Sequence, residues 1–141
     1  MRILVYDPEL CIACGICEEV CSETFFQGGD VEKTKIRIHT EGGGLPSASF
    51  CNQCGECIDI CPTEALYRDK RGVIRLRREL CVGCLSCVGF CPSLVMHWHP
   101  DEEFPHKCIS CGVCVRECPE GALEIVDVDE VPAPAAPYGS V

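Results

Sequence analysis

The chain has 141 residues, of which 16 are cysteine, and its formal net charge is -10. Cysteine at this level is foreign to ordinary globular domains, and the acidic balance argues against a long basic groove for nucleic acid. No run approaches the roughly 18 to 20 apolar residues of a membrane-spanning helix, and residues 1–11 lack a signal-peptide core. We therefore expect a cytoplasmic chain, and in that reducing compartment dense cysteine indicates metal rather than disulfides.

The first third of the chain predicts short strands around a cysteine group. An apolar strand is expected at residues 3–6, just before the first cysteines. Charged and apolar residues alternate over residues 33–40, which predicts a second strand, between a turn at 28–30 and a loop at 42–46.

The rest of the chain predicts further short elements, so the fold class is α+β. Residues 62–80 are expected to form a hairpin whose turn is Asp69–Gly72, and residues 123–128 a last strand. Residues 131–141 contain three prolines and no periodic pattern, which predicts a mobile tail or a strap laid on a partner.

All 16 cysteines fall into four copies of the spacing C-x2-C-x2-C-x3-C. This is the run of bacterial ferredoxins, in which three thiolates hold one 4Fe-4S cubane and the fourth reaches the neighbouring cluster. We therefore expect four 4Fe-4S clusters with these sixteen cysteines as iron ligands. The groups are Cys11, Cys14, Cys17 and Cys21; Cys51, Cys54, Cys57 and Cys61; Cys81, Cys84, Cys87 and Cys91; and Cys108, Cys111, Cys114 and Cys118.

The residues beside the cysteines also repeat. Glycine follows the second cysteine in three copies, where the missing side chain is expected to let backbone N–H groups approach the cluster sulfurs. Proline follows the fourth cysteine in three copies, as in the bacterial motif. The exceptions are Leu85 in the third copy, where we expect the Ser86 hydroxyl to contribute, and Ser22 in the first.

Two other uses of dense cysteine fit less well. Structural zinc normally has paired C-x2-C units separated by a longer spacer, often with histidine, whereas here the third and fourth cysteines follow at once. A disulfide scaffold requires export, for which we find no signal. The four histidines, His39, His97, His99 and His106, are not needed as ligands because each cluster already has four cysteines.

Cross-ligation requires that the motifs pair, either consecutively or nested, and the gaps between them favour nesting. The hairpin between the second and third motifs makes these two a unit, and strands before the first motif and after the fourth are expected to pair. We expect an outer unit of residues 1–50 and 92–130, an inner unit of 51–91, and a tail of 131–141. The ligand sets under nesting are Cys11, Cys14, Cys17 and Cys118; Cys108, Cys111, Cys114 and Cys21; Cys51, Cys54, Cys57 and Cys91; and Cys81, Cys84, Cys87 and Cys61.

Basic residues are concentrated around the predicted hairpin. They form either a docking patch for an acidic partner surface or a solvated face that balances cluster charge. Lys33, Lys35 and Arg37 alternate with Ile36 and Ile38 and are expected to behave in the same way. The hairpin set is Arg68, Lys70, Arg71, Arg75, Arg77 and Arg78.

The four motifs, the IRI strand after the first and the CPTEALYRD segment after the second resemble a family, the four-cluster polyferredoxin-like subunits of molybdenum and tungsten oxidoreductases. The resemblance covers residues 1–128. The short chain is most similar to the small subunit of tungsten-dependent aldehyde oxidoreductases, and subunits of formate dehydrogenases, hydrogenases and sulfoxide reductases are also similar. The resemblance implies a large catalytic partner that holds tungstopterin or molybdopterin, with a flavin subunit, ferredoxin or further copies of this chain as exchange partners.

Three functions are open at this point. An iron-sulfur cubane with four thiolates has no vacant ligand position, so the chain is expected to move single electrons and not to be an enzyme by itself. It would do so as a wire within a larger oxidoreductase or as a freely diffusing polyferredoxin. An independent enzyme is least favoured, because we find no phosphate-binding loop, radical-type cysteine motif or nucleophile triad.

Overall fold

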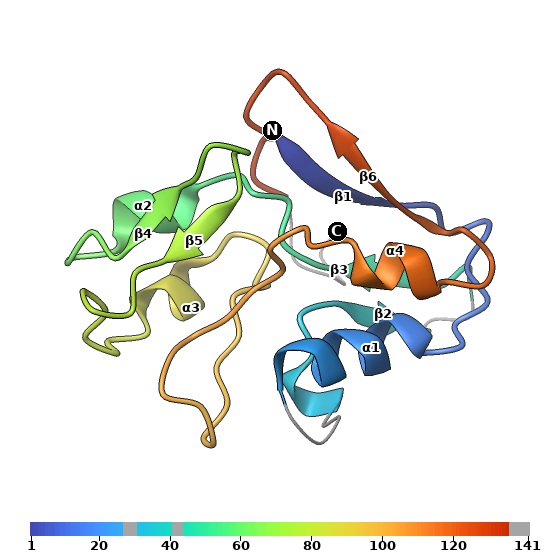
Figure 1. Ribbon diagram of the computed structural model, residues 1–141, viewed down its shortest axis with the longest axis horizontal. Helices are drawn as coiled ribbons and strands as arrows, with labels where there is room; N and C mark the ends of the chain where they lie inside the picture. Colours follow the sequence, from blue (N-terminus) through green and yellow to red (C-terminus); the bar gives the residue numbers. More distant parts are fainter. Residues whose placement is uncertain (27–30, 41–43, 136–141) are drawn as a thin grey trace.

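In the computed structural model, which describes residues 1–26, 31–40 and 44–135, elements from both ends of the chain lie together and the middle elements lie beside them (Figure 1). We call these the outer unit and the inner unit. The outer unit contains β1 (Arg2–Tyr6), α1 (Ile16–Phe25), η1 (Val31–Lys33), β2 (Arg37–His39), β3 (Ser47–Ser49), α4 (Val113–Glu117) and β6 (Leu123–Asp127). The inner unit contains α2 (Glu56–Ile60), β4 (Leu66–Arg68), β5 (Ile74–Leu76) and α3 (Ser86–Phe90).

These short antiparallel strand pairs and short helices confirm the predicted α+β class. The unit boundaries at 50/51 and 91/92 stay predictions, and only residues 131–135 of the predicted tail are described. Across the described ranges, no helix has the length and apolar character that crossing a membrane requires.

Each of the helices α1 to α4 begins after the second cysteine of a motif, and its end depends on whether proline follows the fourth cysteine. Three helices last five residues and stop before the fourth cysteine, which proline follows in these motifs. Proline disfavours a helical conformation in the residue before it and cannot donate a helical hydrogen bond. The first motif has Ser22 instead, and α1 continues through Cys21 to Phe25.

The outer unit is closed by β1 and β6, the predicted strands at the two ends of the chain. They pair antiparallel, with Leu4 opposite Ile125 and Tyr6 opposite Leu123. The side chain of Leu4 is buried with Leu123 and Ile36 in a cluster that also contains cysteines of the first and fourth motifs. The pairing therefore brings the first and last motifs into one core, and α1 packs against α4 there.

The inner unit is built on the predicted hairpin. Leu66 of β4 lies opposite Leu76 of β5, and both strands pack on Cys57 and Cys87. Asp69 shapes the turn, because its Oδ1 accepts hydrogen bonds from the N–H groups of Arg71 at 2.9 Å and Val73 at 3.0 Å. The turn predicted at Asp69–Gly72 is confirmed.

The alternating stretch at 33–40 was predicted wrongly in most of its length. Only Arg37–His39 is a strand, Lys33 belongs to η1, and the side chain of Lys35 is buried instead of solvated. The Thr34 hydroxyl donates to the Ile36 carbonyl at 3.0 Å, and this local bond folds the backbone out of a pleated strand. The turn predicted at 28–30 lies outside the described residues, as do residues 42 and 43 of the loop predicted at 42–46.

A long loop between α3 and α4 is pinned by two histidines. The backbones of His97 and His106 exchange hydrogen bonds of 2.7 and 2.8 Å, and their rings lie 6.1 Å apart. His97 Nε2 and both ring nitrogens of His106 are buried without a hydrogen-bond partner. Burial lowers the pKa of each ring to about 4, so both histidines are neutral at pH 7.

Buried neutral histidine makes the fold sensitive to acid. The unfolded state takes up protons below pH 6.5 while the folded state does not until about pH 4, so stability falls as pH drops through that window. Replacing His97 with leucine should reduce the loss in unfolding free energy between pH 7 and pH 5 by about 1–2 kcal/mol. Denaturant titrations at both pH values measure this loss, and an equal loss in His97→Leu and wild type would contradict the assignment.

Candidate iron-sulfur site

The four cysteine loops share one backbone conformation. In every copy the residue before the second cysteine and the residue after it have positive φ. This backbone region is unfavourable for residues other than glycine. The values after the second cysteine are 80° at Gly15, 87° at Gly55 and 85° at Gly112, and Leu85 adopts 60° in the same place. The glycines are thus explained by backbone shape, and the third loop keeps that shape at some conformational cost.

This loop shape aims backbone N–H groups at cysteine sulfur. The first cysteine accepts from the residue two positions later in three motifs, for example from Ala13 to Cys11 Sγ at 3.4 Å. The fourth cysteine of two motifs accepts from the residue four positions later, as in Ala65 to Cys61 Sγ at 3.3 Å. In the third motif the N–H and the hydroxyl of Ser86 lower the pKa of Cys84, as expected for that copy.

The structure brings thiols of different motifs together. Three cavities are each lined by the first three cysteines of one motif and the fourth of another. Cys61 lies near the remaining three cysteines, Cys81, Cys84 and Cys87. The pKa of Cys87 shows this, because it is raised first by burial, then by the charge of Cys84 and then by the charge of Cys61. The three cavity sets are Cys11, Cys14, Cys17 and Cys118; Cys21, Cys108, Cys111 and Cys114; and Cys51, Cys54, Cys57 and Cys91.

The thiols of a set surround a space and do not converge on a point. In residues 1–26, 31–40 and 44–135 no three His, Cys, Asp or Glu side chains are close enough to share one metal ion. Four thiols around a cavity, with N–H groups donating to their sulfurs, suit a cubane, whose four irons each take one thiolate. None of the four histidines, all within the described ranges, lines these three cavities.

Burial keeps several of these thiols protonated in the absence of metal. It raises the pKa of Cys17, Cys57 and Cys114 to about 12 and that of Cys87 to about 11. Iron binds the thiolate, so filling the site must release these protons and place the bound group inside the two cores. Cluster binding and folding are therefore linked.

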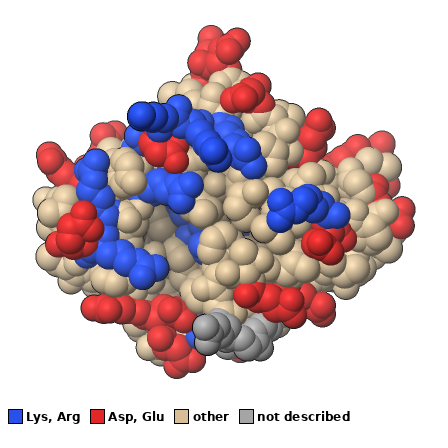
Figure 2. All heavy atoms as spheres, viewed as in Figure 1, with Lys and Arg blue, Asp and Glu red and all other residues tan. Residues whose placement is uncertain are grey.

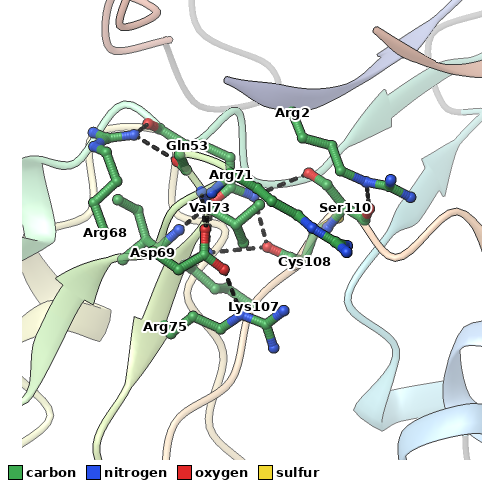
Figure 3. A network of polar contacts seen from close by, with 12 residues as sticks. Arg2, Gln53, Arg68, Asp69, Arg71, Val73, Arg75, Lys107, Cys108 and Ser110 are labelled. Atoms are coloured by element: carbon green, nitrogen blue, oxygen red, sulfur yellow. Dashed lines mark hydrogen bonds and ion pairs between the residues drawn. The ribbon is translucent and has the colours of Figure 1, made fainter. Parts of the chain in front are cut away.

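A polar junction joins the two units, and sequence reasoning missed it. Gln53, fully buried in the second motif, donates from Nε2 to the Cys108 carbonyl at 2.9 Å (Figure 3). Its Oε1 accepts from Lys107 Nζ at 2.8 Å and from the Ile74 N–H at 3.0 Å. The only signal in the sequence was a large polar residue where the other motifs have Ala, Gly or Ser.

Among the basic residues of the hairpin, Arg68 bonds to backbone carbonyls, whereas Arg75 and Arg77 contact side chains of the hairpin itself. Arg68 points into the inner unit and donates to the carbonyls of Gln53 at 2.9 Å and Gly72 at 2.7 Å, so its expected role in a docking patch gives way to a structural one. Arg75 pairs with Asp69 at 3.1 Å, and the Arg77 guanidinium lies 4.0 Å from the centre of the Tyr67 ring. Lys and Arg side chains gather over β4, β5 and their turn, with acidic side chains around the margin (Figure 2).

The repeated motifs match known domain models. Three overlapping segments, residues 10–66, 50–95 and 73–119, each match a model described as a 4Fe-4S dicluster domain. Together they include all 16 cysteines, so the chain fits four 4Fe-4S clusters.

Whole-chain comparison finds relatives of the same kind. The chain is 31% identical over 138 residues to the ferredoxin-like protein YdhX of Escherichia coli K12, with 85% of this chain and 62% of the relative covered. It is 31% identical over 146 residues to protein NrfC of the same strain, covering 90% and 66%. It is 27% identical over 147 residues to the thiosulfate reductase electron transfer subunit PhsB of Salmonella typhi, covering 91% and 77%.

The chain thus spans a little less than two thirds of the length of YdhX and NrfC, and more of PhsB. Its dicluster domains, its sixteen cysteines in four motifs and these relatives agree on one assignment. The chain is a ferredoxin-like 4Fe-4S protein related to NrfC and PhsB.

Proposed function

We propose that the chain carries single electrons through four 4Fe-4S clusters as the iron-sulfur subunit of a larger oxidoreductase complex. The observation that carries this is the set of four thiols around each of three cavities, which would leave a bound cubane no ligand position for a substrate. The similarity to PhsB, a thiosulfate reductase electron transfer subunit, supports the same role.

Within this proposal the clusters are cross-ligated between nested motifs. The support is the sharing of cavities: Cys118 lies with Cys11, Cys21 with Cys114, and Cys91 with Cys51. The first and fourth motifs then hold two clusters of the outer unit, and the second and third hold two of the inner unit. The Gln53 junction joins the site of the second-motif cysteines to the site of the fourth-motif cysteines, and we call these two the facing sites. Electrons would cross between the units there.

The two remaining sites would lie at opposite ends of this path. Cys14 in the first motif and Cys84 in the third are exposed, as is Cys111 in the fourth. Apolar side chains surround the Cys84 loop, namely Leu80 at 41% exposure, Val82 at 69%, Phe90 at 69% and Leu94 at 55%. We call these four the apolar collar, and the exposed Arg77 and Arg78 precede it in the chain.

We propose that the apolar collar receives the catalytic partner. Exposed apolar side chains with a basic border fit a protein surface that is apolar at its centre and acidic at its edge. The resemblance noted above makes a large molybdopterin or tungstopterin subunit the expected partner, and a tungsten-dependent aldehyde oxidoreductase the most specific form of the hypothesis. Partner contact at the collar would bring the redox centre of that subunit close to the Cys84 site.

Cysteine double variants test the nested ligand sets. Cys118→Ser combined with Cys11→Ser should lose only one cluster, so iron falls from about 16 to about 12 per chain, because both residues serve the same cubane. Cys118→Ser combined with Cys81→Ser should lose two. Iron and sulfide analysis after anaerobic purification measures this, and the reverse pattern would establish consecutive pairing.

Anaerobic purification of the tagged chain from its native cells tests the partner. A large subunit with near-stoichiometric molybdenum or tungsten should accompany the wild type and the control Leu45→Glu, whose side chain is 65% exposed outside the collar. Phe90→Glu should lose the subunit and keep its iron, since a carboxylate in the collar would be buried unpaired. Iron alone in the wild type would indicate a free polyferredoxin, and retention by Phe90→Glu would place the contact elsewhere.

A further inference from the structure

Each of the two sites that face the unit boundary has one buried lysine. Lys107 lines the cavity of the second-motif cysteines, and Lys35 lines the cavity of the fourth-motif cysteines. Their side chains belong to residues only 6% and 8% exposed. No Lys or Arg lines the third cavity, which is lined by Cys11 and Cys118 and borders Glu120, in the described part of the chain.

Neutral groups hold both ammonium groups. Lys107 Nζ donates to Gln53 Oε1 at 2.8 Å and to the Cys108 carbonyl at 3.0 Å. Lys35 Nζ lies 3.5 Å from the centre of the Phe25 ring, a cation–π contact. Among the described residues no carboxylate pairs with either lysine. A buried ammonium without a carboxylate is costly unless other negative charge lies near it.

With clusters bound, their thiolates would supply that negative charge. Lys107 lies between the units, with Cys108 of the outer unit next to it in the chain and Cys51 and Cys57 of the inner unit in the same cavity.

We propose that Lys35 and Lys107 are positioning and charge residues that make the two facing clusters easier to reduce than the first-motif cluster, whose cavity is lined by no Lys or Arg among the described residues. Each cubane with four thiolates is an anion that gains one further negative charge on reduction, and a fixed cation beside it stabilises that charge. The lysines act on the potential and take no part in ligation. This inference rests on the proposed function, because it requires the four clusters.

The consequence is a graded path. An electron on the chain would reside next to the two lysines, and the first-motif site near Cys14 would be reduced after the two facing sites. A reduced cluster next to these lysines would let the chain hold one electron until its partner delivers the next. The step is electron exchange alone, in which the reduced cluster loses what the oxidised one gains.

Potentiometric titration monitored by EPR tests the proposal on the purified holoprotein. Wild type should take up two electrons at a higher potential than the electron of the first-motif cluster. Lys107→Met should shift at least one of the two high-potential steps downward by about tenfold in its equilibrium constant, about 59 mV for one electron. Lys35→Met should do the same, and the control Lys70→Met, on the exposed hairpin turn, should change nothing.

Iron analysis of every variant separates the failures. A chain without about 16 irons in the wild type would remove the proposed function itself. If Lys107→Met does not hold iron, Gln53→Glu supplies the test, because a carboxylate of the same shape beside Lys107 should also lower the potential. At full iron content, unchanged potentials in Lys35→Met together with unchanged potentials in either Lys107→Met or Gln53→Glu would overturn the proposal.

Discussion

In the proposed ligand sets no motif completes a cluster site by itself, and the fold meets this constraint by placing cysteines of different motifs around common cavities. The first three cysteines of each motif lie in a loop of two-residue gaps, and the following helical turn carries the fourth away from them. The fourth thiol must therefore be supplied by another motif that packs alongside. The pairing of β1 with β6 and the packing of α1 against α4 do this for the outer unit, and α2 against α3 does it for the inner unit.

This requirement explains why so small a chain has two cores. Each core contains few large apolar side chains, and its cysteines are part of it. A core of this size is a weak source of stability by itself, which is the usual situation in which small proteins use metal. Burial raises the pKa of thiols such as Cys17 and Cys114, so their thiolates are unfavourable by themselves. Bound iron neutralises the charge of these thiolates and joins distant parts of the chain.

Features fixed by local chemistry could be predicted from the sequence. The motif spacing indicated the cubanes, Asp69 and Gly72 indicated the hairpin turn, and Pro62 marks a helix end that the structure contains. The stretch at 33–40 failed because its period of two is also compatible with a turn held by the Thr34 hydroxyl. Charge alone did not show whether a basic residue faces solvent or the interior.

The junction between the units depends on tertiary contacts and lay beyond prediction. Gln53 bonds to residues 21 and 55 positions away, and Lys107 reaches Gln53 across 54 positions. Nothing next to these residues in the chain distinguishes them from surface side chains. The same holds for the apolar collar, because exposure of Val82 and Phe90 follows from what the fold leaves uncovered.

The most direct test of this account is Mössbauer spectroscopy with iron, sulfide and zinc analysis of the chain, purified anaerobically after growth on ⁵⁷Fe. Four cubanes ligated by cysteine alone should give about 16 irons and about 16 sulfides per chain, with all iron in the signature of 4Fe-4S clusters. Zinc in place of iron, or iron without matching sulfide, would contradict the assignment.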